Sequence, residues 1–383
     1  MLFGKSVNKT GTKVSYSLFE GKEINEYNLT ITAVPGEKLT DQIVNLRESL
    51  MEFLDQHNLR QSNIVFQRIY ASDISNQSEE LKTISFCAAV SFVQQPPLSN
   101  AKISIWIILR QSINGNSLKI KTGENEIIFA HNGYSHAFLS QICSTGQNDS
   151  YSQTRSIFKH YTSWLTNEKL TLADNCIRTW IFVRDIDNNY SGMVKARNDV
   201  FTREGLTPDT HFIASTGIEG QTLITSALVM MDAYSINGLD DGQIKYLKAL
   251  EYLNPTHEYG VAFERGTAVD YGDRRDIFIS GTASIDCNGD ILYPNDIEKQ
   301  TERGFNNIKA LLHEAEADIG DVNSMTVYLR DRADAMFIEN YLASNFPDIP
   351  TILVLAAVCR SGWLIEIECI AIKSIVNPVF RNF

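Results

Sequence analysis

The chain has 383 residues, of which 43% are apolar and 21% are charged, a composition typical of a folded globular protein. This length exceeds the usual size of one domain and suggests two or three structural units. The formal net charge of −12 argues against nucleic acid as the main partner, because phosphate binding requires a basic surface. No apolar segment approaches the length of a membrane span, so we expect no membrane association.

The cysteines and histidines form no metal-binding pattern. The six cysteines are scattered without a CxxC spacing, and the seven histidines show neither HxxxH nor HExxH pairing. The first 23 residues contain no apolar segment like that of a secretory signal. The glycines fit neither GxGxxG nor a phosphate-binding loop. We therefore expect a cytoplasmic protein with reduced thiols, no metal site and no organic cofactor.

One pattern occurs three times along the chain, at residues 42–73, 153–185 and 300–331. Each segment opens with Gln and closes with Asp, and the two are 31, 32 and 31 positions apart. Each begins with an amphipathic helical pattern and continues through a polar connector into a strand such as "NIVFQRIYAS" or "MTVYLRD". A second helical stretch and another strand follow. We interpret the pattern as an internal repeat.

Strand-rich blocks precede the second and third repeated helices, namely "KISIWIILRQ" through "NEIIFAHNG" and "DIFISGTASIDCNGDILYP". An order of hairpin, helix, strand, helix and strand predicts α+β units, in which helices cover one face of a mixed sheet. Polar stretches at 143–154 and 234–243 are typical of linkers. We therefore divide the chain into a divergent first unit at 1–145, a second at 150–235 and a third at 245–375.

The segment "VCRSGWLIEIECIA" near the C-terminal end combines a Cys-Arg pair with two glutamates in a strand pattern. Because side chains on a strand alternate between its faces, Glu366 and Glu368 share one face. Cys359 and Arg360 precede this strand across a short turn. Taken alone, the pattern also describes the solvated side of a half-exposed strand.

Four motifs, "FISGTASID", "QTERGFNNIKALLHEAEADIGDV", "MTVYLRDRADA" and "VCRSGWLIEIECIAI", together resemble the RidA/YjgF/UK114 family over residues 260–374. The resemblance implies a chorismate-mutase-like α+β unit, trimers with sites in the clefts between subunits, and hydrolysis of reactive enamines and imines. It also implies that Arg360 binds a substrate carboxylate and that Glu366 positions the attacking water. Three such units in one chain suggest a pseudo-trimer whose working cleft lies between units two and three.

The segments "IRTWIFV", "KARNDVFTREGL" and "FIASTGIEG" extend the similarity, over about residues 170–374, to the chorismatases. These long members of the superfamily cleave chorismate into pyruvate and a cyclohexadiene diol or a hydroxybenzoate. Chorismate carries two carboxylates, which suit the planar fork of arginine, and Arg360, Arg178 and Arg197 lie on the matching motifs. Burial would raise the pKa of Glu366 and let it act as a general acid near neutral pH.

Further site residues follow from the same resemblance. Cys359 and Gly281 match the branch that forms hydroxybenzoate, although Cys359 also fits a small core residue. Thr216 would offer a hydroxyl to a carboxylate, or simply end a strand in a turn. Tyr190 would close the cleft by hydrogen bonding. Each arginine could instead form a surface ion pair, and we expect Glu368 to remain on the solvated face.

Three functional hypotheses remain open from the sequence. The first is a chorismatase-like enzyme in which Glu366 protonates the enolpyruvyl group and pyruvate leaves. The second is a RidA-type enamine or imine deaminase that uses the same Arg360 and Glu366. The third is a non-catalytic ligand-binding protein, because a fold does not fix a function. We expect a small carboxylate as the ligand, and either a monomeric pseudo-trimer or a homo-oligomer.

Overall fold

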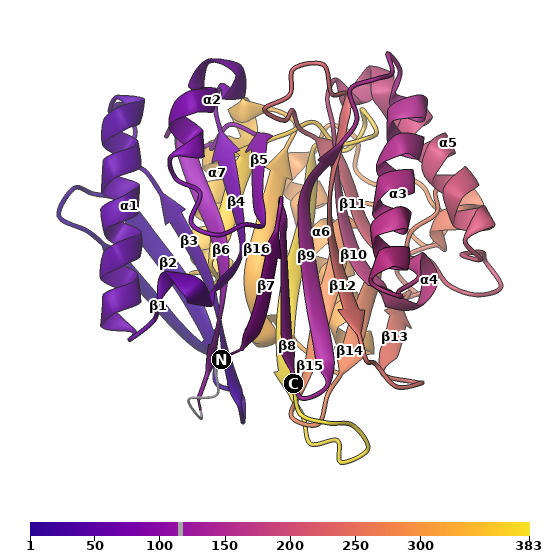
Figure 1. The fold of residues 1–383 in the computed structure, drawn as a ribbon. Helices are drawn as coiled ribbons and strands as arrows, with labels where there is room; N and C mark the ends of the chain where they lie inside the picture. Colours follow the sequence, from indigo (N-terminus) through magenta and orange to yellow (C-terminus); the bar gives the residue numbers. More distant parts are fainter. Residues whose placement is uncertain (114–117) are drawn as a thin grey trace.

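The computed structural model describes residues 1–113 and 118–383 of the chain. These residues form three six-stranded sheets, which lie at the centre of the molecule with helices on the outside (Figure 1). The predicted α+β class and the arrangement of three similar units are confirmed. Among the helices of the described residues, none combines the length and the apolar character that a membrane crossing requires.

The elements divide into three consecutive sets, one for each sheet. Unit one contains β1 (Leu2–Val7), β2 (Lys13–Phe19), β3 (Ile24–Thr32), α1 (Leu39–Gln56), β4 (Ile64–Ala71), α2 (Ile74–Lys82), β5 (Val90–Gln94) and β6 (Ile103–Ser112). Unit two contains β7 (Lys119–Gly123), β8 (Glu126–His131), β9 (Tyr134–Cys143), α3 (Ser150–Asn167), α4 (Leu172–Asn175), β10 (Cys176–Val183), α5 (Ile186–Arg203), β11 (Ala214–Glu219) and β12 (Val229–Asn237). Unit three contains β13 (Ile244–Leu247), β14 (Gly266–Asp270), β15 (Arg274–Thr282), α6 (Ile297–Glu314), β16 (Val322–Leu329), α7 (Ala335–Asn345), β17 (Thr351–Leu355) and β18 (Ile365–Ser374).

All three sheets have the same topology. In unit three the order is β13-β14-β15-β18-β16-β17, and the corresponding strands of units one and two follow the same order. The last two sheet positions form a parallel pair in each unit, β4 with β5, β10 with β11 and β16 with β17. A parallel pair needs a crossover connection, and here α2, α5 and α7 provide it. The shared topology explains the threefold sequence pattern.

The Asp that closes each repeated segment marks the start of the crossover. Asp73 begins α2 and its side chain accepts the N–H of Asn76, while Asp331 accepts the N–H of Ala333 in the turn before α7. Asp185 occupies the same position before α5 without such a bond. A carboxylate at this position satisfies an amide that has no partner within the helix. Capping of the following helical turn therefore explains this Asp in units one and three.

The predicted boundary between units one and two requires correction. The strand β6 closes the first sheet, whereas β7, β8 and β9 belong to the second, so unit two begins near residue 119 and not at 150. Residues 114–117, which the sequence division assigned to unit one, lie outside the described residues. The pattern of a strand does not reveal which sheet it joins, because that choice depends on pairing with a distant strand. Here β9 pairs with β12, which follows it by almost ninety residues.

The inner faces of the three sheets share one apolar core. Phe66 of unit one stacks on Trp180 of unit two at 6.1 Å between ring centroids and contacts Phe138 at 5.2 Å. Tyr234 of unit two contacts Phe278 of unit three at 5.4 Å. Burying aromatic surface from all three units in one cluster stabilises their association. The units therefore pack as one body and do not form separate domains.

The edges of units two and three meet along β11. Ala214 forms a parallel bridge with Glu264, and the N–H of Glu219 donates to the carbonyl of Ala357 at 3.2 Å. β11 also lies beside β15. This junction brings α5 of unit two toward the segment that connects β17 and β18, and the cavity described next lies here.

Candidate active site

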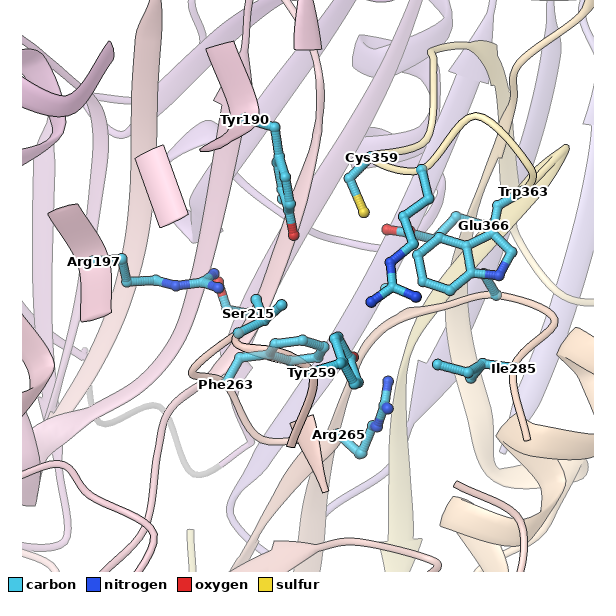
Figure 2. A pocket seen from close by; sticks show the side chains of 15 residues that line it. Tyr190, Arg197, Ser215, Tyr259, Phe263, Arg265, Ile285, Cys359, Trp363 and Glu366 are labelled. Atoms are coloured by element: carbon cyan, nitrogen blue, oxygen red, sulfur yellow. The ribbon is translucent and has the colours of Figure 1, made fainter. Parts of the chain in front are cut away.

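A cavity of about 40 Å³ lies at the junction of units two and three (Figure 2). Unit two contributes side chains from α5 and β11, and unit three contributes β15, β18, the segment before β14 and the β17–β18 connection. In Figure 2, Arg197 lies on one side of the cavity, and Glu366 and Trp363 lie on the other. The site predicted between these two units thus coincides with a cavity.

Glu366, on β18, is the acidic residue that lines this cavity. It is 5% exposed, and no described residue donates a hydrogen bond to its carboxyl within normal geometry. Burial, reinforced by the nearby negative charge of Glu368, raises the pKa of Glu366 to about 8, although Arg178 and Arg265 oppose the shift. The carboxyl is therefore mostly protonated at neutral pH and can donate a proton to a bound molecule.

Gly281, on β15, makes room for this carboxyl. A Cβ atom built on Gly281 would lie 2.0 Å from Oε1 of Glu366, which is far closer than atoms can approach. The register between β15 and β18 shifts between Ile279 and Thr282, so the strand is irregular at this point. The predicted site residue Gly281 therefore lines the cavity, and its role there is to leave space for the acid.

Glu368 has a different environment from the one the sequence predicted. It is buried rather than solvated, because its strand face is directed into the pseudo-trimer. Its carboxylate accepts hydrogen bonds from Arg178 at 2.6 Å, from Trp180 at 3.1 Å and from Tyr328 at 3.0 Å. An ion pair so deeply buried needs these additional donors to offset desolvation. Glu368 thus belongs to a buried hydrogen-bond network that lies behind the cavity wall and supports it.

Arg178 and Thr216, which the sequence suggested as substrate contacts, belong to this same network. Nη2 of Arg178 donates to Thr216 Oγ1 at 2.5 Å as well as to Glu368, and the Thr216 hydroxyl donates to Glu368. Thr216 Oγ1 also accepts the N–H of Gly281 at 2.8 Å. Neither side chain lines the cavity, since their polar atoms already have partners in the protein. Sequence alone could not distinguish these residues from free anchors.

Arg197 and Arg360 do line the cavity, as predicted. Arg197, on α5, is 1% exposed, and its Nε and Nη2 atoms have no hydrogen-bond partner among the described residues. The guanidinium of Arg360 lies over the rings of Tyr259 at 4.6 Å and Trp363 at 4.9 Å. A buried guanidinium without a partner is costly, so Arg197 suits an anionic ligand, and Arg360 adds a second guanidinium to the same wall.

Cys359 and Tyr190 face one another across the junction (Figure 2). Burial raises the pKa of Cys359 to about 12, and the neighbouring charge of Glu366 adds to the effect. Burial likewise raises the pKa of Tyr190. Cys359 is therefore a neutral thiol and not a thiolate nucleophile. Both predicted residues line the cavity and contribute an uncharged part of its wall.

Several lining residues were not identified from the sequence: Ser215, Tyr259, Phe263, Arg265 and Trp363. Arg265 supplies a third guanidinium, which its hydrogen bonds to the Asn254 carbonyl and side chain hold in place. Trp363 lies within the motif "VCRSGWLIEIECIA", four residues after Cys359. Its position in that motif was the one sequence signal that could have identified it. Arg265 follows an irregular segment, and no local pattern predicts where such a segment points.

The other two units lack the acid at the equivalent position. Glu366 lies opposite Tyr328 in the β16–β18 pairing. In unit one the residue opposite Tyr70 is Ser104, and in unit two the residue opposite Phe182 is Met230. The three sheets thus share a framework, but within the described residues Glu366 has no acidic counterpart at these positions.

Comparison with known proteins identifies relatives of unit three and of the whole fold. Residues 266–373 match the family model described as endoribonuclease L-PSP. A RutC family protein of Pyrococcus abyssi is 37% identical over 99 residues, which cover 25% of this chain and 78% of that protein. The 3-aminoacrylate deaminase RutC of Acinetobacter baylyi is 32% identical over 72 residues, or 19% of this chain and 57% of that protein. The crystal structure of a chorismatase matches 93% of this chain and 99% of its own chain, with a TM-score of 0.64 at 15% identity.

Proposed function

This chain belongs to the RutC family, within the RidA/YjgF/UK114 superfamily, and from that premise we propose that it is a chorismatase-like enzyme. The proposed reaction cleaves chorismate to pyruvate and a hydroxybenzoate, or a cyclohexadiene diol. The observation that carries the proposal is a buried carboxyl, Glu366, which faces a cavity lined by three guanidinium groups and whose pKa is raised by burial. The match to the fold of a chorismatase over 93% of the chain supports it.

The charges of the cavity suit a ligand with two carboxylates. Arg197, Arg265 and Arg360 line it, whereas Glu366 is the single acidic residue among the described lining residues. Since Glu366 is mostly neutral at pH 7, the cavity carries a net positive charge. Two carboxylates would each find a guanidinium, and the third would stabilise charge that develops during the reaction.

Glu366 would act as the general acid. Its proton goes to the terminal methylene carbon of the enolpyruvyl group, which leaves an electrophilic carbon next to the ether oxygen. Cleavage of the ether then releases pyruvate. Formation of hydroxybenzoate consumes no water, because the ring loses a proton as it becomes aromatic, whereas formation of the diol adds one water. The uncharged Cys359 in the wall occupies space that a water would need, which favours the first outcome.

A second candidate function is hydrolysis of a reactive enamine or imine. It is favoured by the relative in Acinetobacter baylyi, which is named a 3-aminoacrylate deaminase. Arg360 and Glu366 would then bind the single carboxylate and position water. This smaller substrate leaves Arg197 and Arg265 without a ligand group, so we rank it second.

The test is to incubate the purified protein with chorismate and to measure pyruvate and the ring products. Glu366→Gln should lower the rate at least 100-fold, since general acid catalysis contributes about 10²–10⁴-fold. Asp334→Asn is the matched control, because Asp334 also has a raised pKa but lies before α7, away from the cavity. Absence of pyruvate, or undiminished release by Glu366→Gln, contradicts the proposal. Ammonia release from 2-iminobutyrate without cleavage of chorismate would support the second candidate, and neither activity would support a non-catalytic ligand-binding protein.

A further inference from the structure

A second cavity adjoins the candidate active site and has no role in the reaction described above. It measures about 110 Å³ and lies between residues 207–212 of unit two and residues 248–265 of unit three. Phe263 and Arg265 line both cavities. In Figure 2 the rings of Phe263 and Tyr259 lie beside Arg265 at the edge of the first cavity. The two cavities are thus neighbours that share part of their walls.

The lining of the second cavity is cationic. Lys248, His211, His257 and Arg265 contribute basic groups, and the one acidic residue among the described lining residues is Glu264. Glu264 is 6% exposed and accepts the N–H of Phe212 at 2.9 Å, and burial raises its pKa. Its carboxyl is thus engaged by the backbone, and the basic side chains outnumber it in the lining. The cavity favours a small anion.

Arg265 connects the two cavities chemically. Its Nε and Nη2 donate to the carbonyl and side chain of Asn254 at 3.0–3.3 Å, and its guanidinium packs against the rings of Tyr259 and Phe263. These contacts fix the orientation of the side chain, and the hydrogen bonds among them go to an amide side chain and a carbonyl, not to a carboxylate. A carboxylate bound in either cavity can therefore interact with the guanidinium of Arg265.

We propose that the second cavity binds a short carboxylate anion, namely the 2-oxo acid that cleavage in the adjoining cavity releases. The identity of this anion rests on the proposed function. A three-carbon acid freed beside Arg265 can move past Phe263 and keep its interaction with that guanidinium. It then gains Lys248 and His257, both of which are exposed to solvent. The volume exceeds by several times the 10–15 Å³ that holds one water, so it accommodates a small acid.

The experiment titrates pyruvate into the protein without chorismate and measures binding by calorimetry. We expect one saturable event, weakened at least about fivefold in Lys248→Ala and further in Lys248→Ala with His257→Ala. Lys159→Ala, an exposed lysine on α3 away from both cavities, is the matched control and should bind as the unaltered protein does. Both altered positions are exposed, so we expect these variants to fold. Absence of saturable binding, or equal affinity in the Lys248 and His257 variants, overturns the inference.

The two proposals fail in distinguishable ways. A protein that releases no pyruvate from chorismate but binds pyruvate in a Lys248-dependent manner contradicts the proposed function and supports the anion site. A protein that cleaves chorismate, while Lys248→Ala leaves the affinity for pyruvate unchanged, contradicts the anion site alone. Acetate serves as a second probe, and binding of acetate with the same affinity would show that the 2-oxo group is not recognised and would overturn the assignment to a 2-oxo acid.

Discussion

Two glutamates on one strand face, Glu366 and Glu368, have different surroundings in the folded protein. The Glu368 carboxylate accepts hydrogen bonds from Arg178 and two aromatic donors. Glu366 is equally buried, yet it receives no such bond from the described residues, and its pKa rises to about 8. Glu368 is therefore held in a buried hydrogen-bond network with Arg178, whereas Glu366 faces the cavity as a candidate proton donor.

Glu366 should make the stability of the protein depend on pH. Its folded-state pKa is raised from 4.5 to about 8, so the protonated form is the one that folding favours. The resulting stability is fully present below the unfolded pKa and is lost as the pH rises through about 8. Glu366→Gln removes this loss, so from about pH 5 to about pH 9 the unaltered protein should lose ~2–5 kcal/mol of unfolding free energy relative to the variant.

Denaturant unfolding of both proteins across this pH range provides the measurement. The rate of chorismate cleavage should fall over the same range above about pH 8, because the general acid ionises. If the two proteins gave parallel curves of stability against pH, the pKa of Glu366 would not be raised by folding. This outcome does not depend on which substrate the protein uses.

Cys359 should influence the product and not the rate of the first step. Its thiol is neutral and buried beside Tyr190, so it occupies space that water would otherwise fill. Cys359→Ala removes a sulfur atom and leaves room for about one water. Since the diol pathway adds a water, the ratio of diol to hydroxybenzoate should increase, as measured by chromatography of the ring products. An unchanged ratio would exclude this role.

At the level of the elements, Arg330 joins three parts of the cavity wall. It follows β16, and its Nη2 donates to both carboxylate oxygens of Asp187, on α5, at 2.8 and 2.6 Å. Its Nη1 donates at 2.7 Å to the carbonyl of Val358, which precedes Cys359. The helix that carries Tyr190 and the segment that carries the Cys-Arg pair are thus held together by one side chain.

Removal of this contact should weaken substrate binding more than it slows the chemical step. Arg330→Met and Asp187→Asn should each raise KM for chorismate about fivefold, which corresponds to about 1 kcal/mol for a well-formed exposed pair. The value of kcat and its pH dependence should change less than about twofold, because Glu366 is not in contact with this pair. Arg332→Met is the control, since Arg332 contacts Asn100 of unit one, outside the cleft. An equal effect of Arg332→Met would argue for general loosening of the units.

At the level of the whole molecule, three similar sheets form one framework, but the described residues place the acid in one junction. The positions equivalent to Glu366 hold Ser104 in unit one and Met230 in unit two. The buried ion pair of Arg68 with Asp232, at 2.8 Å, joins units one and two as Arg178 and Glu368 join units two and three. The remaining junctions therefore have a structural part in holding the pseudo-trimer together.

This asymmetry predicts one substrate site per chain. Chorismate titrated into Glu366→Gln, which should bind without turnover, should saturate at one molecule per chain in calorimetry. Arg197 supplies the control, since Arg197→Ala should abolish most of this binding by removing a buried cation from the single site. A stoichiometry of three would show that the other junctions also bind the ligand.

The sequence by itself determined the α+β class, the threefold repeat and the two candidate residues Glu366 and Arg360. The class and the repeat follow from helical and strand periodicity, and the two residues follow from a short motif that resembles a known family. Both residues line the cavity. The division of the chain failed at β7–β9 because strand pairing over long distances leaves no local signal.

Only the tertiary structure decided which polar residues face the cavity. Arg178 and Arg197 are both buried arginines on family-like motifs, yet Arg178 is paired with Glu368, whereas Arg197 has guanidinium atoms without partners among the described residues. The roles of Glu366 and Glu368 separate for the same reason. Partners at these sites come from other units, more than a hundred residues away in most cases. Burial and charge pairing are properties of the folded neighbourhood, and the order of residues along the chain does not contain them.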